Sequence, residues 1–169
     1  MCENPNQKAA YVCDYLKNLG INFLMKTHEP AETLEKCAEI EKLIDGKICK
    51  NLFLQTTSGN MHYLLMMSGE KKFVTKEVSK ALGSSRLSFS SGDKMEKMLK
   101  TSPGSLSIIS LIFDVEKKVS LAIDNDILKE EYICCHPCDC TATLKIKTSD
   151  ITDIFIPSLG ITPIIIDIA

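Results

Sequence analysis

The spacing of apolar and polar residues predicts a chain in which helices and short strands are mixed. An apolar stripe with helical spacing runs through residues 11–19 and stops before Gly20, a residue that suits a left-handed helix cap. We therefore expect a helix from Asn6 to Leu19. Apolar segments bounded by turn residues predict strands at 21–27, 47–55 and 61–67, and the turn sequence TTSGN joins the last two as a hairpin.

The rest of the chain continues this mixture. We expect helices around residues 32–44, from Thr75 to Leu82, and over 92–99, where Ser91 supplies the cap. The remaining predicted elements are strands at 86–89, 106–114, 119–124, 131–135, 141–146 and 161–168, a helical turn at 125–129, and a helix that Thr148 and Ser149 cap and that ends before Gly160. Because strands and helices do not alternate regularly, we predict an α+β fold with a mostly antiparallel or mixed sheet.

Length and composition narrow the class of protein. The 169 residues favour a single domain over residues 1–169, and the 44% hydrophobic and 25% charged content is that of a soluble globular protein. No apolar stretch approaches the roughly 20 residues that a membrane-spanning helix needs. The N-terminal sequence lacks the basic start and apolar block of a secretion signal. We therefore expect a cytoplasmic protein whose cysteines are thiols.

The net charge of −2 conceals an uneven distribution. Residues 71–100 contain eight basic and three acidic side chains, which is +5 locally and leaves −7 for the rest of the chain. A basic surface on an acidic body suits contact with a phosphate backbone. Two helices with solvated lysine faces would explain the same charges equally well.

A run of cysteines, YICCHPCDCTATLKI at residues 132–146, raises the question of a metal site. Cys135 and Cys138 form a C-x-x-C unit, but the second pair that a closed zinc site needs is missing from this chain. In an extended segment, alternate side chains lie about 6.6 Å apart, whereas zinc-bound sulfurs lie about 3.8 Å apart. We expect these thiols to pack as small apolar groups and to bind no metal. The alternative hypothesis is a zinc or redox protein.

Three further features carry candidate chemistry, and each also has a plain structural explanation. Lys50 shares a face of its predicted strand with aliphatic residues, so its ammonium either reaches out from the sheet rim or acts on an ester, carboxylate or phosphate in a pocket. Pro103 and Gly104 form a turn in which the amides of Gly104 and Ser105 could face an oxygen. His136 ends a predicted strand and could donate a proton or a hydrogen bond. A lone histidine is more often structural.

In combination with other motifs, these residues resemble one family. The motifs occur in the order THEPAETLEKCAE (27–39), KNLFL (50–54), LGSSRLSFSS (82–91), TSPGSLS (101–107), ND (125–126) and HPCDCTATLKI (136–146). Each is weak alone, but the ordered set resembles the freestanding YbaK/prolyl-tRNA synthetase-associated editing domains from about residue 20 to the C-terminus. The resemblance implies an α+β fold around a curved, barrel-like mixed β-sheet flanked by helices. It also implies hydrolysis of mischarged aminoacyl-tRNA.

The resemblance also assigns residues. It implies that Lys50, Gly104, Ser105 and His136 are catalytic and that His28, Asn51, Phe53, Arg86 and Pro103 bind substrate. Lys50 would anchor the charged end of the substrate, the loop amides would polarise the ester carbonyl, and His136 would hold the terminal ribose or a water. The general base stays open. Neither a cofactor nor a metal is implied.

Two positions depart from the family pattern. Cys140 replaces the asparagine that follows the histidine motif, which removes two hydrogen-bond donors and an acceptor. Gln55 stands where an acidic residue is common. The departure at Cys140 favours one alternative, a catalytically weak module of the same fold that binds an amino acid or aminoacyl-tRNA.

The resemblance is strongest to alanyl-tRNA(Pro) deacylases, with cysteinyl-tRNA(Pro) deacylases as the nearest rival. The expected partners are the acceptor end of mischarged tRNA(Pro) and prolyl-tRNA synthetase, with no membrane and no DNA. A synthetase site built for proline cannot firmly reject smaller alanine, because missing methylenes are worth only about 1–3 kcal/mol. A second, smaller site would then destroy the alanyl ester and exclude the prolyl ester.

Overall fold

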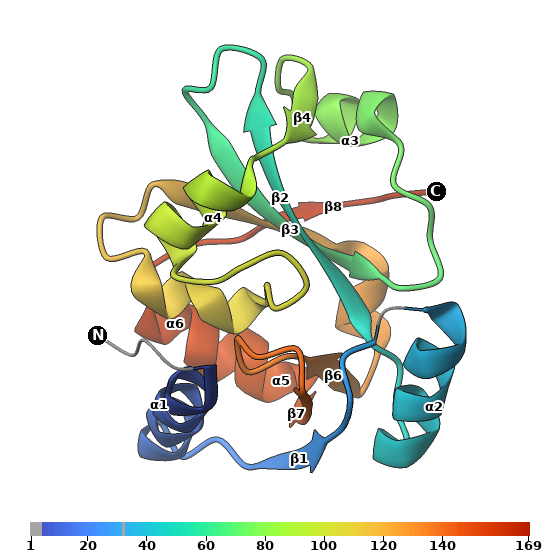
Figure 1. Cartoon of the computed structure of the whole chain (residues 1–169). Coiled ribbons are helices and arrows are strands. Elements are labelled where there is room, and N and C mark those ends of the chain that lie inside the picture. The colour runs from blue at the N-terminus through green and yellow to red at the C-terminus, as the bar shows by residue number, and fades with distance from the viewer. Residues whose placement is uncertain (1–4, 32) are drawn as a thin grey trace.

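Two β-sheets form the framework of the molecule (Figure 1). This computed structural model describes residues 5–31 and 33–169. The larger sheet has the strand order β4-β2-β3-β5-β8, built from Leu87–Phe89, Cys49–Thr56, His62–Ser68, Val119–Asp124 and Ile164–Ile166. The smaller sheet has the order β1-β7-β6, built from Phe23–Thr27, Ala142–Lys147 and Tyr132–Cys135. Strand β2 is antiparallel to β3 and β4, whereas β5 is parallel to β3 and β8.

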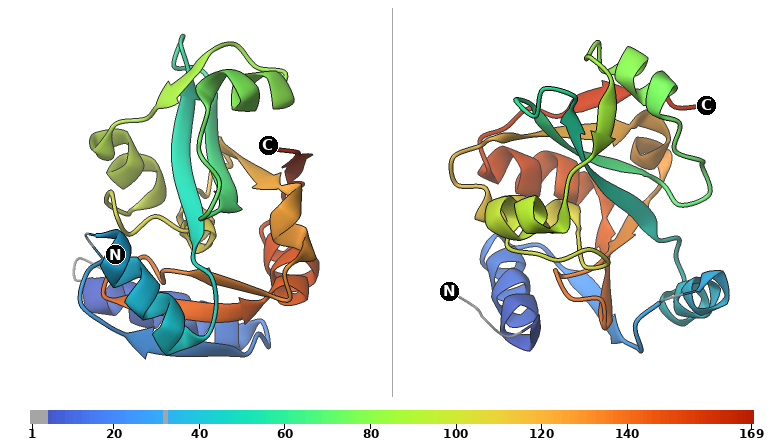
Figure 2. Two further views of the ribbon diagram at one scale, coloured as in Figure 1. Left: turned by 90° about the vertical axis from the view of Figure 1, so that its right-hand side faces the viewer. Right: turned by 45° about the horizontal axis from the view of Figure 1, so that its top comes forward.

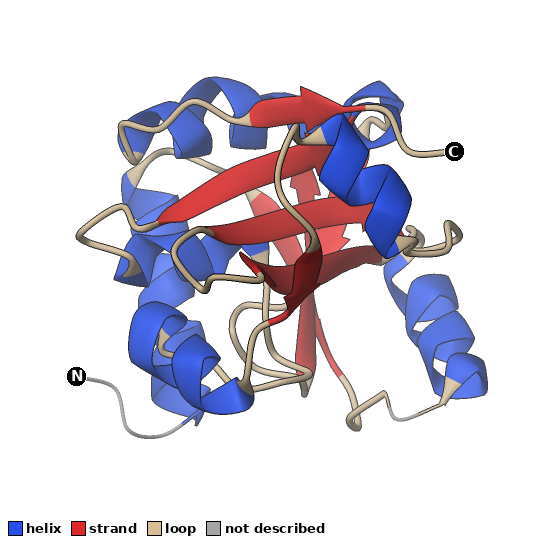
Figure 3. Cartoon of the chain, turned by 90° about the horizontal axis from the view of Figure 1, so that it is seen from above, coloured by secondary structure: helices blue, strands red, loops and turns tan. Residues whose placement is uncertain are grey.

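Helices surround the two sheets (Figure 3). The α-helices are α1 (Pro5–Asn18), α2 (Leu34–Ile44), α3 (Thr75–Ala81) and α4 (Gly92–Leu99), and two 3₁₀ segments are η1 (Ile108–Phe113) and η2 (Asn125–Lys129). A last helical stretch joins α5 (Thr148–Asp150), the π-helical η3 (Ile151–Phe155) and α6 (Ile156–Ser158). Strand β2 runs from the smaller sheet at one end to β4 and α3 at the other (Figure 2). In the described ranges, no helix has the length and apolar character needed to cross a membrane.

The α+β prediction is confirmed, and the described strands do not form a closed barrel. We expected one curved, barrel-like mixed sheet, and the structure has two separate sheets with a single parallel bridge between Ile48 and Cys134. Ile48 directly precedes β2, and Cys134 lies within β6. Among the described residues, this bridge is isolated from the named strand pairs. The pairing does not continue along the strands, so the framework stays open.

The larger sheet is buried on both faces, which explains why its central strand shows little alternation. Leu64 and Met66 of β3 belong to a core cluster that also includes residues of α1, η1 and the smaller sheet. Leu65 and Met67 point the other way, into a smaller cluster with α3 and β8. All four side chains are fully buried. Because successive side chains of a strand face opposite sides, a strand covered on both faces reads as one apolar run.

Several local predictions are confirmed. Helix α1 ends one residue before the expected position, and Gly20 follows it with a φ of +77°. The Ser91 hydroxyl accepts a hydrogen bond from the Lys94 amide at 3.2 Å and caps α4 as expected. The hairpin of β2 and β3 is present. The predicted start of the second helix at residue 32 lies outside the described residues, and α2 has Thr33 as its N-cap.

Two predictions in the C-terminal half of the chain are wrong. The strand expected at 106–114 is the 3₁₀ segment η1, because the Ser107 hydroxyl accepts from the Ile109 amide while the Ser110 hydroxyl accepts from the Ser107 amide. Thr148 does not cap the last helical stretch, because its hydroxyl donates to the Glu130 carbonyl at 2.6 Å. The final strand is confined to Ile164–Ile166, shorter than the segment predicted.

Candidate functional site

Two histidines meet at one end of the smaller sheet. His28 directly follows β1 and His136 directly follows β6, and β7 lies between these strands. The backbone N–H of His28 continues the β1–β7 pairing by donating to the Thr141 carbonyl at 2.8 Å. The centroids of the two imidazole rings are 6.1 Å apart. The structure therefore brings together two predicted site residues that are far apart in the sequence.

The hydrogen bond of His136 defines where its proton lies. Its Nδ1 is 2.7 Å from the carbonyl oxygen of Ala142, and because a carbonyl only accepts, Nδ1 carries the proton. Burial lowers the pKa of His136, partly opposed by the Ala142 bond and reinforced by His28. The ring is therefore neutral at pH 7, and its Nε2 is an acceptor with no hydrogen-bond partner among the described residues.

Both ring nitrogens of His28 are held by the protein. Nδ1 lies 2.8 Å from the Glu29 carbonyl, and Nε2 lies 2.8 Å from the hydroxyl of Thr143. The carbonyl assigns the proton to Nδ1, so the Thr143 hydroxyl donates to Nε2 when the ring is neutral. Thr143 is fully buried, so this bond fixes the ring in place. A substrate that reaches His28 would contact its ring and not its nitrogens.

The loop that contains Pro103 and Gly104 is exposed at its tip. Gly104 has a φ of +91°, a conformation that side-chain-bearing residues rarely adopt, and this requirement explains the glycine. We expected the amides of both Gly104 and Ser105 to face an oxygen. The Ser105 amide instead donates to the Ser102 carbonyl at 3.0 Å, which closes the turn. Of these two amides, that of Gly104 has no hydrogen-bond partner among the described residues.

The loop that contains Gly104, called the glycine loop, leads into a segment that contacts the loop between β6 and β7, which begins with His136. This segment is η1, where the Ser110 hydroxyl lies 3.3 Å from the Cys138 sulfur. Burial raises the pKa of Cys135, the residue before His136, and the nearby Ser107 hydroxyl partly opposes this shift. The two cysteines flank His136 on both sides in the sequence. The structure therefore brings the predicted loop and the predicted histidine into one region.

Strand β2 brings Lys50 to the same region. The bridge between Ile48 and Cys134 joins the start of β2 to β6, and Lys50 and His136 each lie two residues beyond this bridge in the same direction. As predicted, alternation places Lys50 on the face of β2 that carries Leu52 and Leu54. Its ammonium is partly buried and donates to the backbone carbonyl of Lys71. No carboxylate of the described residues forms an ion pair with it.

Two buried polar atoms near these elements have no partner in the described parts of the chain. They are the amide oxygen Oδ1 of Asn51, on β2, and the hydroxyl of Thr101, at the start of the glycine loop. A buried acceptor without a hydrogen bond costs about 1–3 kcal/mol relative to a paired one. Asn51, a predicted substrate-binding residue, therefore has an acceptor that a donor on a ligand would satisfy.

The other two predicted substrate-binding side chains lie elsewhere. Phe53 is buried in the larger core cluster, where its ring stacks on His62 with centroids 5.7 Å apart. Arg86 is exposed, and its carbonyl accepts from the amide of Thr57 at 3.0 Å. Thr57 is seven residues beyond Lys50, which is about 23 Å along an extended strand. Arg86 therefore lies at the far end of β2 and does not join the histidines.

The cysteines of the described chain are all free thiols, and Cys2 lies outside the described residues. Burial raises the pKa of Cys49 to about 12 and that of Cys134 and Cys138 to about 11. Burial also raises the pKa of Cys135. These thiols are protonated at neutral pH and pack as apolar groups. No three histidine, cysteine, aspartate or glutamate side chains within residues 5–31 and 33–169 converge as metal ligands.

The two departures from the family pattern occupy different surroundings. Cys140 is a partly buried free thiol in the loop between β6 and β7. The amide oxygen of Gln55 accepts from the Lys94 ammonium at 2.7 Å and from the Ser90 hydroxyl at 3.2 Å. A glutamine oxygen thus takes the contact with a cation that an acidic residue would make.

Two partners of the site residues were missed. Thr143 holds His28, and the Lys71 carbonyl receives the Lys50 ammonium. Lys71 lies outside the quoted motifs, and Thr143 lies within HPCDCTATLKI but had no assigned role. The pairing of β1 with β7, in which Thr27 lies opposite Ala142, is the signal that would have placed Thr143 near His28.

Comparison with known proteins shows a consistent relationship. The chain matches the model of the aminoacyl-tRNA editing domain over residues 28–154. It is 31% identical over 139 residues to the prolyl-tRNA editing protein ProX of Acetoanaerobium sticklandii, and the match covers 82% of this chain and 85% of that protein.

Solved structures support the fold. One is described as a candidate trans-editing enzyme for prolyl-tRNA synthetase; it superposes with a TM-score of 0.69 at 14% identity, over 96% of this chain and 98% of that chain. Another, a scaffold protein used for epitope grafting, has a TM-score of 0.72 at 15% identity, over 96% of this chain and 97% of its own. At these identities the likeness concerns the fold alone.

Proposed function

Because this chain belongs to the aminoacyl-tRNA editing domain family, we propose that it deacylates mischarged tRNA(Pro), with alanyl-tRNA(Pro) as its substrate. The likeness to a prolyl-tRNA editing protein over most of both chains supports the choice of tRNA. One structural observation supports the hydrolysis. The neutral imidazole of His136 presents an unpartnered Nε2, in the described chain, beside the glycine loop and the start of β2.

The reaction is the hydrolysis of an ester. A water oxygen attacks the carbonyl carbon of the aminoacyl group, and the bond from that carbon to the terminal ribose oxygen breaks. The proton lost by the water ends on the ribose oxygen, which leaves free alanine and a tRNA with a free terminal hydroxyl. An aminoacyl ester is already activated, so catalysis needs placement of the water and stabilisation of the developing oxyanion.

The candidate residues match these two needs. The Nε2 of His136 accepts a hydrogen bond from the water or from a ribose hydroxyl and so orients it. The amide of Gly104 donates to the ester carbonyl as its oxygen becomes negative. The Lys50 ammonium, which forms no ion pair in the described chain, attracts the same oxygen or the terminal phosphate. The Asn51 oxygen accepts from the ammonium or a hydroxyl of the substrate.

The remaining assignments follow from position. Ser105 and Pro103 shape the turn that presents Gly104. His28 supports one wall beside His136, and Phe53 backs β2 from the core side. Arg86, at the far end of β2, contacts a phosphate of the tRNA acceptor stem. A long ligand such as tRNA is able to reach both ends of the strand, and prolyl-tRNA synthetase is the enzyme whose errors supply it.

A deacylation panel tests the proposal. Purified protein is incubated with alanyl-, cysteinyl- and prolyl-tRNA(Pro), and the loss of each amino acid is followed against buffer. We expect alanyl-tRNA(Pro) to be cleaved fastest and prolyl-tRNA(Pro) to survive. If cysteinyl-tRNA(Pro) is cleaved fastest, the substrate is wrong and the reaction is right. If all three survive as they do in buffer while the protein binds them, the chain is a binding module.

A further inference from the structure

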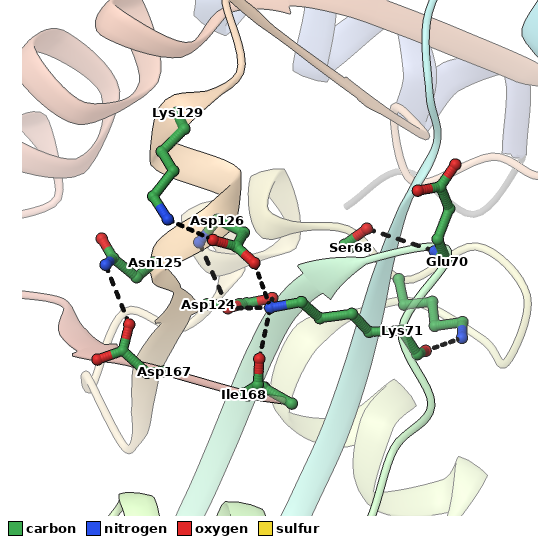
Figure 4. A network of polar contacts seen from close by, with 10 residues as sticks. Ser68, Glu70, Lys71, Asp124, Asn125, Asp126, Lys129, Asp167 and Ile168 are labelled. Carbon is green, nitrogen blue, oxygen red and sulfur yellow. Dashed lines mark hydrogen bonds and ion pairs between the residues drawn. The ribbon is translucent and has the colours of Figure 1, made fainter.

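Lys71 is the centre of a network of charged groups that the motifs did not predict (Figure 4). It lies between β3 and α3, and its Nζ is 3.0 and 2.9 Å from the two carboxylate oxygens of Asp124 and 2.6 Å from Asp126. The same Nζ donates to the carbonyl of Ile168 at 2.6 Å. Four oxygen atoms from three residues therefore surround one ammonium.

The backbone of Lys71 serves a different group. Its carbonyl oxygen accepts a hydrogen bond from the Nζ of Lys50. Lys71 thus links two ammonium groups. Its own ammonium is held by the surrounding carboxylates, and its backbone carbonyl holds the ammonium of Lys50. The position of Lys50 depends on where Lys71 is held.

The two ammonium groups differ in their charge environment. Lys71 is paired with two carboxylates, whereas Lys50 is paired with none of the described ones. Asp124 is fully buried, so its carboxylate requires a compensating cation. Lys50 contacts Lys71 itself and is a neighbouring cation available to replace it. If Lys71 were neutral, attraction to Asp124 and Asp126 would draw the Lys50 ammonium away from the substrate.

We propose that Lys71 is a positioning residue for the deacylation reaction, an inference that rests on the proposed function. Its side chain neutralises Asp124 and Asp126 so that the ammonium of Lys50 stays free of carboxylates. Its carbonyl oxygen holds that ammonium in the direction from which it meets the substrate. The ND motif at 125–126, which had no assigned role, supplies one of the carboxylates.

The test compares three variants with the wild type in steady-state deacylation of alanyl-tRNA(Pro). Lys71→Met should lower kcat about tenfold or more with little change in KM, because Lys50 acts on the transition state. Lys71→Arg keeps the charge and should keep most of the activity. Lys129→Met is the matched control, since Lys129 also pairs with Asp126, at 2.6 Å, but does not contact Asp124 or Lys50.

A double variant separates positioning from a merely structural role. Lys71→Met/Asp124→Asn removes the cation and the buried carboxylate together, so Lys50 is no longer drawn away and kcat should recover. A folded Lys71→Met protein with wild-type kcat would overturn the inference. So would a folded double variant that is as slow as the single one. If Lys71→Met alone does not fold, a folded double variant with a kcat about tenfold or more below wild type still overturns the inference, because it buries no unpaired charge at this point.

The same experiments distinguish failure of the proposed function from failure of the role proposed for Lys71. A wild-type protein that deacylates no tRNA in the panel removes the function and this inference together. An active wild type with an unaffected, folded Lys71→Met variant removes the inference alone. Circular dichroism melts of all variants establish which of them are folded.

Discussion

The imidazole rings of His28 and His136 lie 6.1 Å apart and are tied to consecutive residues of one strand. His136 donates to the carbonyl of Ala142, and His28 accepts from the hydroxyl of Thr143. Strand β7 thereby fixes both rings, although they extend from different neighbouring strands. The geometry of the candidate site is set by the start of β7, which carries none of the predicted catalytic groups.

Replacing His136 tests its role directly. His136→Ala removes the Nε2 acceptor and should lower kcat for alanyl-tRNA(Pro) by about 100-fold or more, the range found for a positioned acid–base group. The buried Ala142 carbonyl also loses its donor, so the melting temperature should fall moderately. Steady-state kinetics and a thermal melt provide the two measurements. Wild-type kcat in the alanine variant would refute a direct role for this imidazole.

The hydroxyl of Thr143 should be important for stability. Thr143→Val keeps the shape of the side chain but leaves the His28 Nε2 without its donor, at a cost of about 1–3 kcal/mol. Thr143→Ser keeps the hydroxyl and loses one methyl group, which costs about 1 kcal/mol. In urea unfolding, Thr143→Val should therefore have a lower free energy of unfolding than Thr143→Ser. Equal stability of the two variants would show that the bond to His28 contributes little.

Stability should decrease as the pH falls from 7 to 5. Burial lowers the pKa of both His136 and His62, and Lys94 lowers that of His62 further. Between the ordinary histidine pKa of about 6.5 and the lowered folded values, the unfolded chain binds more protons than the folded one. The free energy of unfolding therefore rises with pH in this window and levels off above it. Urea titrations at several pH values measure this slope.

A variant supplies the control for that slope. His62→Gln/His136→Gln removes both groups and should flatten the dependence between pH 5 and 7 expected from the lowered histidine pKa values. A slope as steep as that of the wild type would mean that other groups titrate in this range.

Lys50→Ala should abolish deacylation and leave the fold intact. The variant removes the free cation from the site, while the lost bond to the partly exposed Lys71 carbonyl costs only about 1 kcal/mol. Lys72→Ala, which changes an exposed lysine close by in the sequence, is the matched control and should retain wild-type activity. Deacylation rates and melting curves compare the two. Full activity of Lys50→Ala would exclude this ammonium from catalysis.

Gly104→Ala should affect activity more than its strain alone explains. An added Cβ at Gly104 meets nothing within 4 Å, so the change introduces strain at φ +91° without a clash. Gly83 also has a positive φ, +62°, and open space around it, so Gly83→Ala is a matched control. Both should lose about 1–2 kcal/mol of stability. If the Gly104 amide contacts the ester, only Gly104→Ala should also lose kcat.

Local signals made much of the fold predictable. Helices α1 and α4 follow from an apolar stripe together with Gly20 and Ser91, which act within a few residues of the helix ends. The segment that forms η1 could not be predicted from such local signals. It is apolar on all sides, so its pattern fits a buried strand as well as a helical segment. The mutual capping by Ser107 and Ser110 decides for the helical form.

The candidate site was predictable only in part. Lys50, Gly104 and His136 could be named from motifs, but their partners depend on strand pairing that the sequence does not display. The pairing of β1 with β7 brings Thr143 to His28. Likewise, Asp124 reaches Lys71 because β3 and β5 are neighbours in the larger sheet. Such contacts join segments far apart in the chain, beyond the reach of local periodicity.

The bond between the Lys71 ammonium and the Ile168 carbonyl has a consequence for the order of events during synthesis. Lys50 emerges from the ribosome early, whereas Ile168 follows β8 and emerges late. Contacts between such distant residues form slowly, because a long loop must close first. The cation that we assign to hydrolysis thus reaches its final setting only after Ile168 has been made. Nascent chains that end before Ile168 should therefore remain idle toward charged tRNA.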